Sequence, residues 1–262
     1  VAYPPGCGQG LGLSRGGTGV VYQAGGTFYR RSHLQIGARD NTKNGYSCWT
    51  VDGATATNDV RDQIYLNYRT NHVAILNMNN GGTVAAKFIH SHVLGTSNVG
   101  TSKAYVNFDG GTFFVKQAGS AFNGTVAGNV NLPDRVTVYK GGATFECTNA
   151  VSIYAPLMKP EGKGVTAINY TGSGFIGAPH VTITGGGGAG ASAIAKFDSR
   201  TGNVTGITIT SPGFGYTSTP TVTLSGGGNT TPISVSSVTI GDSATTGGLT
   251  KNGSGTLGLM VS

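Results

Sequence analysis

Short runs of alternating apolar and polar residues, separated by glycine, fill most of this chain. Val, Ile, Leu and Phe recur at two-residue spacing, which is the pattern of a pleated strand with one buried face. Asn107 is an exception, because the pattern places this polar residue on the buried face, between Val106 and Phe108. A one-residue change of register would account for it, because such a shift moves every side chain of a strand to the opposite face. The side chains expected to stack into an inner ladder are Tyr22, Trp49, Met78 and Val138, with Phe28, Val84 and Phe113. We therefore expect strands and almost no helix.

A Gly-Gly-Thr motif marks the breaks between these runs. It occurs at 25–27, 81–83 and 110–112, with variants at 52–55 and 141–144, and these five segments are nearly evenly spaced along the chain. A repeat of this kind predicts a solenoid in which each period forms one coil. Glycine reaches positive φ at little cost, so the pair is expected to turn a corner, and the following Thr to lie beside its equivalents in neighbouring coils.

A second repeat follows the first, in which the segment 174–187 returns as 215–228. Between the copies, 193–197 and 204–209 flank a turn-like stretch at 198–203, which predicts a hairpin. Residues 247–259 are again strand, turn and strand. The predicted fold is all-β: a right-handed β-helix-like solenoid of about five coils over 1–160, a small antiparallel β-module of two pseudo-repeats over 161–235 and solenoid-like terminal strands over 236–262.

Composition supports this fold. Glycine occurs 46 times, and charged residues make up only 10% of the chain. The net charge of +7 reflects few acids rather than many bases, so it is compatible with acidic glycans or nucleic acid but indicates no dedicated site for either. The chain has no aromatic-basic nucleic-acid motif, and we expect no nucleic-acid partner. No apolar run approaches the ~18 residues of a membrane helix, and we expect no membrane span in this chain. Because it begins at Val1, we expect a processed or partial piece of a longer product.

The three cysteines, Cys7, Cys48 and Cys147, are an odd number without CxxC spacing. This disfavours metal chelation and thioredoxin-like chemistry. One disulfide at most can form within the chain, and Cys7 with Cys48 is the preferred pair because Cys147 is expected about three coils away from Cys48. Three buried thiols are the alternative.

The stretch from Gly247 to Leu259, with Gly-Gly-Leu-Thr-Lys before a glycine turn and Gly-Thr-Leu, resembles the passenger-associated repeat of bacterial autotransporter-type proteins. The Gly-Gly-Thr coils and the Gly-Gly-Ala-Thr segment at 141–144 are similar to the same class, the autotransporter-associated β-strand repeat proteins. The resemblance covers most of residues 16–260. It implies a secreted or surface-displayed bacterial protein with a β-helical stalk, which serves as an adhesin, matrix or fibre.

Candidate chemistry is sparse. His90 and His92 share one face of an expected strand, but no acidic or Cys partner lies nearby in sequence, so exposed polar positions are favoured over a metal clamp. The densest polar cluster could form a glycan-binding or lyase groove, or else a solvated outer face with ion pairs. It runs from Asn58 to Asp62 and continues with Tyr65, Tyr68, Arg69 and His72, and the candidate glycan contacts within it are Asp59, Arg61, Asp62, Tyr65 and Tyr68. We predict no catalytic, cofactor-binding or metal-ligating residue, and no cofactor.

The function expected from the sequence is that of an extracellular structural protein, a subunit or segment of a bacterial surface fibre or adhesin. Assembly as a homo-oligomer or filament is expected through strand edges or head-to-tail contacts, with Leu249, Leu257 and Leu259 as the candidate contact. The alternatives are a β-helical polysaccharide lyase or hydrolase with its groove near Asp59, Arg61 and Asp62, and a non-catalytic glycan-binding module that uses Tyr65, Tyr68 and Trp49. The dispersed acids, ten in all, disfavour an enzyme.

Overall fold

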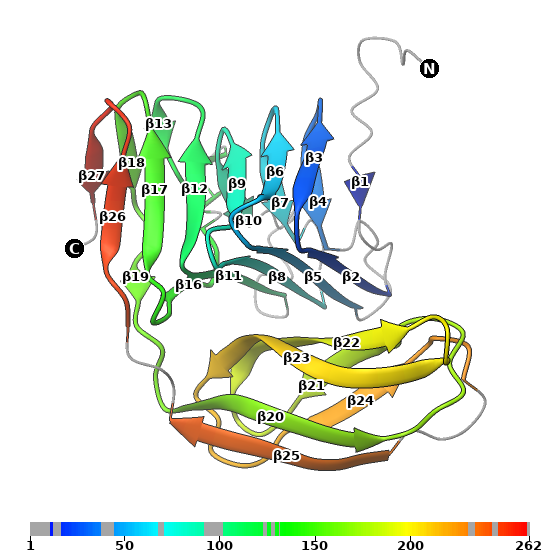
Figure 1. Cartoon of the computed structure of the whole chain (residues 1–262). Coiled ribbons are helices and arrows are strands. Elements are labelled where there is room, and N and C mark those ends of the chain that lie inside the picture. Colours follow the sequence, from blue (N-terminus) through cyan, green and yellow to red (C-terminus); the bar gives the residue numbers. More distant parts are fainter. Residues whose placement is uncertain are drawn as a thin grey trace. The chain divides into compact units, whose positions relative to one another are not determined.

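The computed structural model describes residues 11–12, 17–37, 45–67, 71–91, 102–122, 125–126, 129–130, 132–229, 234–242 and 246–260 (Figure 1). Every regular element in these ranges is a β-strand, as the sequence predicts. The chain divides into two compact units, one made of residues 1–158 and 246–262 and the other of residues 159–245. The terminal strands thus belong to the first unit, and the second unit is inserted between its two parts.

Parallel strands build the first unit as a β-solenoid, and four sheets carry its coils. Sheet B contains β2 (Thr18–Gln23), β5 (Gly45–Asp52), β8 (His72–Asn79), β11 (Lys103–Asp109), β16 (Arg135–Val138) and β19 (Leu157–Met158). Sheet C contains β3 (Gly26–Arg30), β6 (Ala56–Val60), β9 (Thr83–Ala86), β12 (Gly111–Val115), β17 (Ala143–Cys147) and β26 (Leu249–Asn252). Sheet A contains β1 (Leu11–Gly12), β4 (Leu34–Ile36), β7 (Ile64–Leu66) and β10 (Ile89–Ser91), and sheet D contains β13 (Gly119–Ser120), β18 (Val151–Ile153) and β27 (Leu257–Leu259).

Successive coils each add one strand to sheet B, one to sheet C and one to the third side of the solenoid. A parallel bridge between Ile89 and Phe122 joins sheets A and D along that third side. The last coil is assembled from distant parts of the chain: β19 supplies its sheet B strand, and β26 and β27 supply the others after the inserted unit. A short antiparallel pair, β14 (Thr125–Val126) and β15 (Asn129–Val130), lies between β13 and β16. The predicted solenoid is confirmed, and its predicted hand stays a prediction.

The inner ladder exists, but the sequence misplaces two of its members. Met78 pairs with Val51, whereas Trp49 pairs with Leu76 in the neighbouring core-side row, and Tyr22 does not face the core. Trp49 pairs with Val21 rather than with Tyr22, and Tyr22 pairs with Thr50 on the opposite side of sheet B. Tyr22 is 38% exposed, and its hydroxyl donates to Asp52 Oδ2 over 2.6 Å. The error arises because the number of residues at the corner differs between coils. The buried core contains Trp49, Val51, Leu76, Met78, Val84, Val106, Phe108, Phe113, Val136, Val138 and Phe145.

The expected register change at Asn107 is confirmed. Phe108, not Asn107, pairs with Met78, because the corner between β11 and β12 is one residue shorter than the corner between β8 and β9. Asn107 instead pairs with Asn77, and its Nδ2 donates to Asn77 Oδ1 over 2.9 Å. Asn77 Nδ2 in turn donates to Thr50 Oγ1 over 2.9 Å, which links three neighbouring strands of sheet B through side chains.

Glycine turns the corners before sheet C, as predicted. Gly26, Gly53, Gly81, Gly110 and Gly142 have φ between 69° and 94°, a region that L side chains rarely adopt. The threonines after these corners are in register across sheet C, although in the second coil the aligned residue is Thr57 and not Thr55. The aligned residues are Thr27, Thr57, Thr83, Thr112, Thr144 and Thr250.

The second unit is an antiparallel β-module with its own apolar core. Sheet F pairs β20 (Lys163–Thr171) with β25 (Ser234–Asp242), and sheet G contains β21 (His180–Thr184), β22 (Ala189–Asp198), β23 (Asn203–Phe214) and β24 (Thr221–Ser225). The predicted hairpin is formed by β22 and β23, whose ends pair at Asp198 and Asn203. Phe175, Val181, Tyr216 and Leu224 are among its buried core residues.

The two sequence repeats of the module are related by an internal pseudo-two-fold axis. Thr182 and Thr223 occupy the same position in the two copies and pair directly with one another in the antiparallel β21–β24 ladder. The glycine-rich turn of each copy lies directly against the backbone of the other copy. A Cβ at Gly186 would lie 2.7 Å from Ser218 O, and a Cβ at Gly227 would lie 2.6 Å from Gly177 O, so neither position has room for a side chain. Glycine is therefore needed in these segments because it allows the backbones of the two repeats to approach closely.

Candidate functional site

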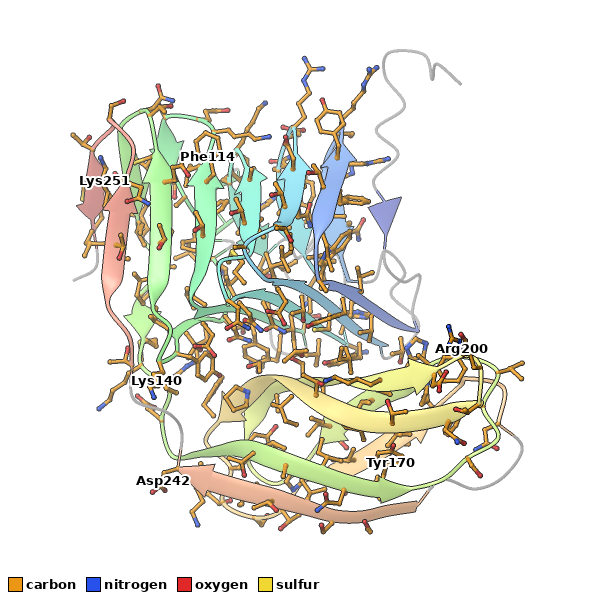
Figure 2. The ribbon with its side chains drawn as sticks, in the orientation of Figure 1. Phe114, Lys140, Tyr170, Arg200, Asp242 and Lys251 are labelled. Carbon is orange, nitrogen blue, oxygen red and sulfur yellow. The ribbon has the colours of Figure 1, made fainter. Side chains whose placement is uncertain are left out.

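The outward side of sheet C carries three rows of side chains that run from strand to strand. The first is the threonine row, whose members are half-exposed or exposed. Two residues further along each strand is a mixed row, which comprises Tyr29, Asp59, Ala85, Phe114, Glu146 and Asn252. Tyr29 is 55% exposed, and Figure 2 labels Phe114 on β12 and Lys251 on β26 of the same sheet. Alternation places both rows opposite the core, because Phe113 between Thr112 and Phe114 is fully buried.

The third row consists of cations, each the first residue after a strand of sheet C. We call Arg31, Arg61, Lys87 and Lys116 the cation row; they follow β3, β6, β9 and β12. Backbone hydrogen bonds align two pairs of neighbours, Arg31 with Arg61 and Lys87 with Lys116, from Arg61 N to Arg30 O over 2.8 Å and from Lys116 N to Ala86 O over 2.9 Å. Lys87 N instead donates to Asp62 O over 2.7 Å, so Lys87 is displaced in register from Arg61. The strand spacing of ~4.8 Å therefore sets the separation of Arg31 from Arg61 and of Lys87 from Lys116.

Two members of the cation row are neutralised by carboxylates. Lys87 Nζ lies 3.1 Å from Asp62 Oδ1, and Lys116 Nζ forms an ion pair with Asp59 Oδ1 and donates to Val60 O over 3.1 Å. Arg31 and Arg61 are exposed, and in the described part of the chain neither has an ion-pair partner. The row consequently keeps uncompensated positive charge at the ends of β3 and β6.

Of the glycan-face residues expected from the sequence, Asp59 and Arg61 lie on the outward side of sheet C, but Tyr65 lies in a different sheet. Asp59 is in the mixed row of sheet C, and Arg61 and Asp62 lie in the turn that follows β6. Tyr65 instead lies on β7 in sheet A, where its ring centroid is 5.1 Å from that of His33 and 4.2 Å from that of His90. Tyr68 is outside the described residues.

Trp49, the third aromatic residue of the glycan-binding hypothesis, is 2% exposed and packs edge-to-face on Phe28 with ring centroids 4.8 Å apart. It belongs to the core and cannot contact a ligand. The residues that sequence reasoning missed are Tyr29, Arg31, Lys87, Phe114 and Lys116. A signal was present, because Arg31, Lys87 and Lys116 each lie five residues after the second glycine of a Gly-Gly-Thr motif.

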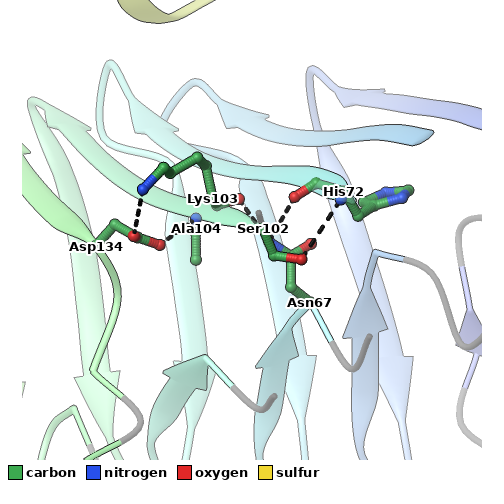
Figure 3. Close-up of polar contacts among 6 residues, drawn as sticks. All are labelled: Asn67, His72, Ser102, Lys103, Ala104 and Asp134. Carbon is green, nitrogen blue, oxygen red and sulfur yellow. Dashed lines mark hydrogen bonds and ion pairs between the residues drawn. The ribbon is translucent and has the colours of Figure 1, made fainter. Parts of the chain in front are cut away.

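A buried polar cluster surrounds His72 at the start of β8 (Figure 3). His72 is 1% exposed, and its Nε2 lies 3.0 Å from Ser47 Oγ. Asn67, at a φ of 58°, donates through Nδ2 to His72 O over 3.1 Å and also to Lys103 O, and thereby ties the ends of β8 and β11 together. Burial lowers the pKa of His72 to about 4, so the ring is neutral at physiological pH.

A neighbouring set of polar contacts links the start of β11 to Asp134, the residue before β16. Asp134 accepts a hydrogen bond from Ala104 N over 2.8 Å, and its other oxygen lies 3.4 Å from Lys103 Nζ. These contacts satisfy backbone groups where the chain enters sheet B. We therefore assign the cluster a structural role.

Metal-ligating groups do not converge in the described ranges: no three His, Cys, Asp or Glu side chains there are close enough to hold an ion. His90 is buried on β10, and His92 lies outside the described residues. Cys147 is a buried free thiol in the core, and Cys48 is buried on β5 in a different sheet. The preferred Cys7–Cys48 disulfide involves Cys7, which is also outside the described residues.

The expected assembly residues lie at one end of the solenoid. Within the described chain β26 and β27 are the outermost strands of sheets C and D. Leu249 is 41% and Leu259 54% exposed, and Leu257 is half-buried. Lys251, between them, pairs with the core residue Phe145 and so occupies a core-side position.

Comparison with protein-family models, with curated proteins and with solved structures found no match to this chain. Among the residues that the structure describes, no helix is long and apolar enough to cross a membrane.

Proposed function

We propose that this chain is a non-catalytic structural protein, a subunit or segment of a bacterial surface fibre or adhesin, that assembles through the end of its solenoid. The observation that carries the proposal is the apolar end strand pair: Leu249 and Leu259 extend the inner ladder beyond Ala143 and Ile153 and are 41% and 54% exposed. Exposed apolar side chains beside unpaired backbone groups favour addition of another strand.

The proposed partner of β26 is β3 of a second copy. Both strands carry a member of the threonine row, so aligning Thr250 with Thr27 would continue that row from copy to copy. This register would place Lys251 beside Phe28, which is only partly buried on the core side of β3. A cation–π contact there would compensate the charge that Lys251 brings to the core side.

End-to-end assembly can be tested by sedimentation velocity and negative-stain electron microscopy over a range of protein concentrations. We expect elongated species that grow with concentration, and their loss in the double variant Leu249→Gln/Leu259→Gln. Ile176→Gln is the matched control, because Ile176 is 84% exposed in the inserted module and its removal should leave assembly unchanged. A monodisperse monomer of the unaltered protein at high concentration would refute the proposal.

The rival hypothesis, a polysaccharide lyase or hydrolase, is less well supported because its candidate carboxylates are engaged. Asp59 pairs with Lys116, and Asp62 pairs with Lys87. Depolymerisation of acidic polysaccharides that is lost in Asp62→Asn would favour the enzyme. The bacterial surface location rests on the resemblance to autotransporter-associated repeats, and protease accessibility on intact cells tests it.

A further inference from the structure

We propose that the outward side of sheet C binds a linear acidic polysaccharide that lies along the direction in which the strands stack. The inference goes beyond end-to-end assembly and does not depend on it, because the face belongs to a single copy of the chain. It rests on three adjacent rows of different chemistry: the threonine row, the mixed row with the aromatic rings of Tyr29 and Phe114, and the cation row.

The cation row supplies the charge preference. Arg31 and Arg61 are exposed on neighbouring coils, at the ~4.8 Å spacing of parallel strands, and have no ion pair in the described ranges. Arginine presents a planar fork of donors that matches carboxylate and sulfate oxygens. Lys87 and Lys116 extend the row, but Asp62 and Asp59 compensate them. We therefore expect the strongest anion attraction beside β3 and β6.

The other two rows suit a sugar chain. Tyr29 is 55% exposed, and Phe114 is half-exposed three strands away, so each can support the apolar face of a sugar ring. The threonine hydroxyls run beside them from β3 to β26 and can donate to or accept from sugar hydroxyls. Beyond β12 the face changes, because Glu146 occupies the mixed row and Thr148, not a cation, follows β17. The proposed footprint is therefore β3, β6, β9 and β12.

The same surface is a poor platform for nucleic acid. Single-stranded nucleic acid is held by aromatic rings on which successive bases stack, whereas Asp59 and Ala85 separate Tyr29 from Phe114. Tight phosphate binding also needs many uncompensated cations, and here two of four are paired with carboxylates. A polyanion whose sugar rings carry hydroxyl groups beside carboxylates or sulfates fits these rows better.

The test measures binding of the whole chain to polygalacturonate and to heparin by isothermal titration calorimetry at two salt concentrations. Fully methyl-esterified polygalacturonate, which has the same backbone without the charges, and an oligothymidylate are the comparison ligands. Arg31→Gln/Arg61→Gln removes the uncompensated cations, and Tyr29→Ala removes the exposed ring. Lys196→Gln/Arg200→Gln is the charge-matched control, because it removes two exposed cations from the inserted module.

We expect at least one acidic glycan to bind, with affinity that falls as salt rises, and the esterified polymer to bind weakly or not at all. Affinity should fall about tenfold in Arg31→Gln/Arg61→Gln, since two exposed charge contacts are lost, and should not change in the control. Tyr29→Ala should weaken binding without altering its salt dependence. Because all the changed side chains are exposed, unchanged thermal unfolding verifies the fold of each variant.

Four results would overturn the proposal. They are absence of binding to both acidic glycans, equal losses in the control and the arginine variant, equal affinity for the esterified polymer, and tighter binding of the oligothymidylate than of either glycan. The last result would assign the face to nucleic acid. None of these outcomes bears on end-to-end assembly, which Leu249→Gln/Leu259→Gln tests separately.

Discussion

At the scale of single residues, side chains of the same type have different roles according to the row they occupy. Tyr22, Tyr29 and Tyr65 are all strand tyrosines, yet Tyr22 donates to Asp52, Tyr29 is exposed on sheet C, and Tyr65 on sheet A packs edge-on against His33 and at a tilt against His90. The pKa of Tyr22 is raised to about 12, mainly because the hydroxyl is partly buried and also because it donates a hydrogen bond to the Asp52 carboxylate. Position in the coil, rather than residue type, decides what each side chain contributes.

His72 should make the stability of the solenoid depend on pH. Its pKa is about 4 in the folded protein and about 6.5 when unfolded, so between these values the unfolded chain binds a proton that the folded chain does not. The free energy of unfolding should fall by up to about 3 kcal/mol as pH drops from 7 through 4, and the contribution of His72 should level off once pH is well below its folded pKa. Urea unfolding at pH 7, 5.5 and 4 measures the slope.

His72→Gln provides the comparison for that slope. Because Gln does not titrate, the variant should be less sensitive to acid than the unaltered protein, although its stability at pH 7 is also lower. His180→Gln, in the inserted module, is the control. Identical pH slopes for the unaltered chain and His72→Gln would show that another group controls acid sensitivity.

At the scale of elements, the corner between sheets B and C sets which side chains face the core. Corners of unequal length explain why Tyr22 and Trp49 are not equivalent and why Phe108 takes the place expected for Asn107. The row of sheet C that holds Gly82 and Gly111 contains Ala56 and Ala143 in other coils. Glycine is therefore required there only where the neighbouring backbone comes close.

Gly111→Ala should destabilise the solenoid strongly. A Cβ at this position would lie 2.4 Å from the carbonyl carbon and oxygen of Met78, which are backbone atoms and cannot move aside cheaply. We expect a loss of about 3 kcal/mol in the free energy of unfolding. In the same kind of corner, Gly248→Ala meets no atom within 4 Å and should change stability by less than about 0.5 kcal/mol. Equal effects of the two substitutions in denaturant titrations would contradict this account of the corners.

At the scale of the whole molecule, the chain is a solenoid whose last coil is interrupted by a module. The ends of the module meet, because Lys163 pairs with Asp242 in sheet F, and its core residues lie within its own strands. An insertion with adjacent ends and a separate core resembles an independent domain. It adds a second fold to the solenoid without changing the register of β26 and β27 on β17 and β18.

Residues 159–245 should therefore fold when expressed alone. We expect dispersed amide signals in an NMR spectrum and a cooperative thermal transition for the isolated module. The chain in which a short Gly-Ser linker replaces residues 163–242 should keep its own transition and its β-rich circular dichroism spectrum. An isolated module without cooperative unfolding would mean that it depends on the solenoid for stability.

The sequence by itself determined the features that depend on local chemistry. Alternation of apolar and polar residues specified strands, the Gly-Gly-Thr motif specified the coil and its glycine corner, and the second repeat specified an antiparallel module. Only the tertiary structure decided that β26 and β27 complete a coil begun by β19, and that Thr57 rather than Thr55 is in register. The physical reason is that register is set by hydrogen bonds between strands distant in sequence, and one residue more or less at a corner reverses every side chain beyond it. The rows on sheet C, and with them the proposed glycan face, follow from that register.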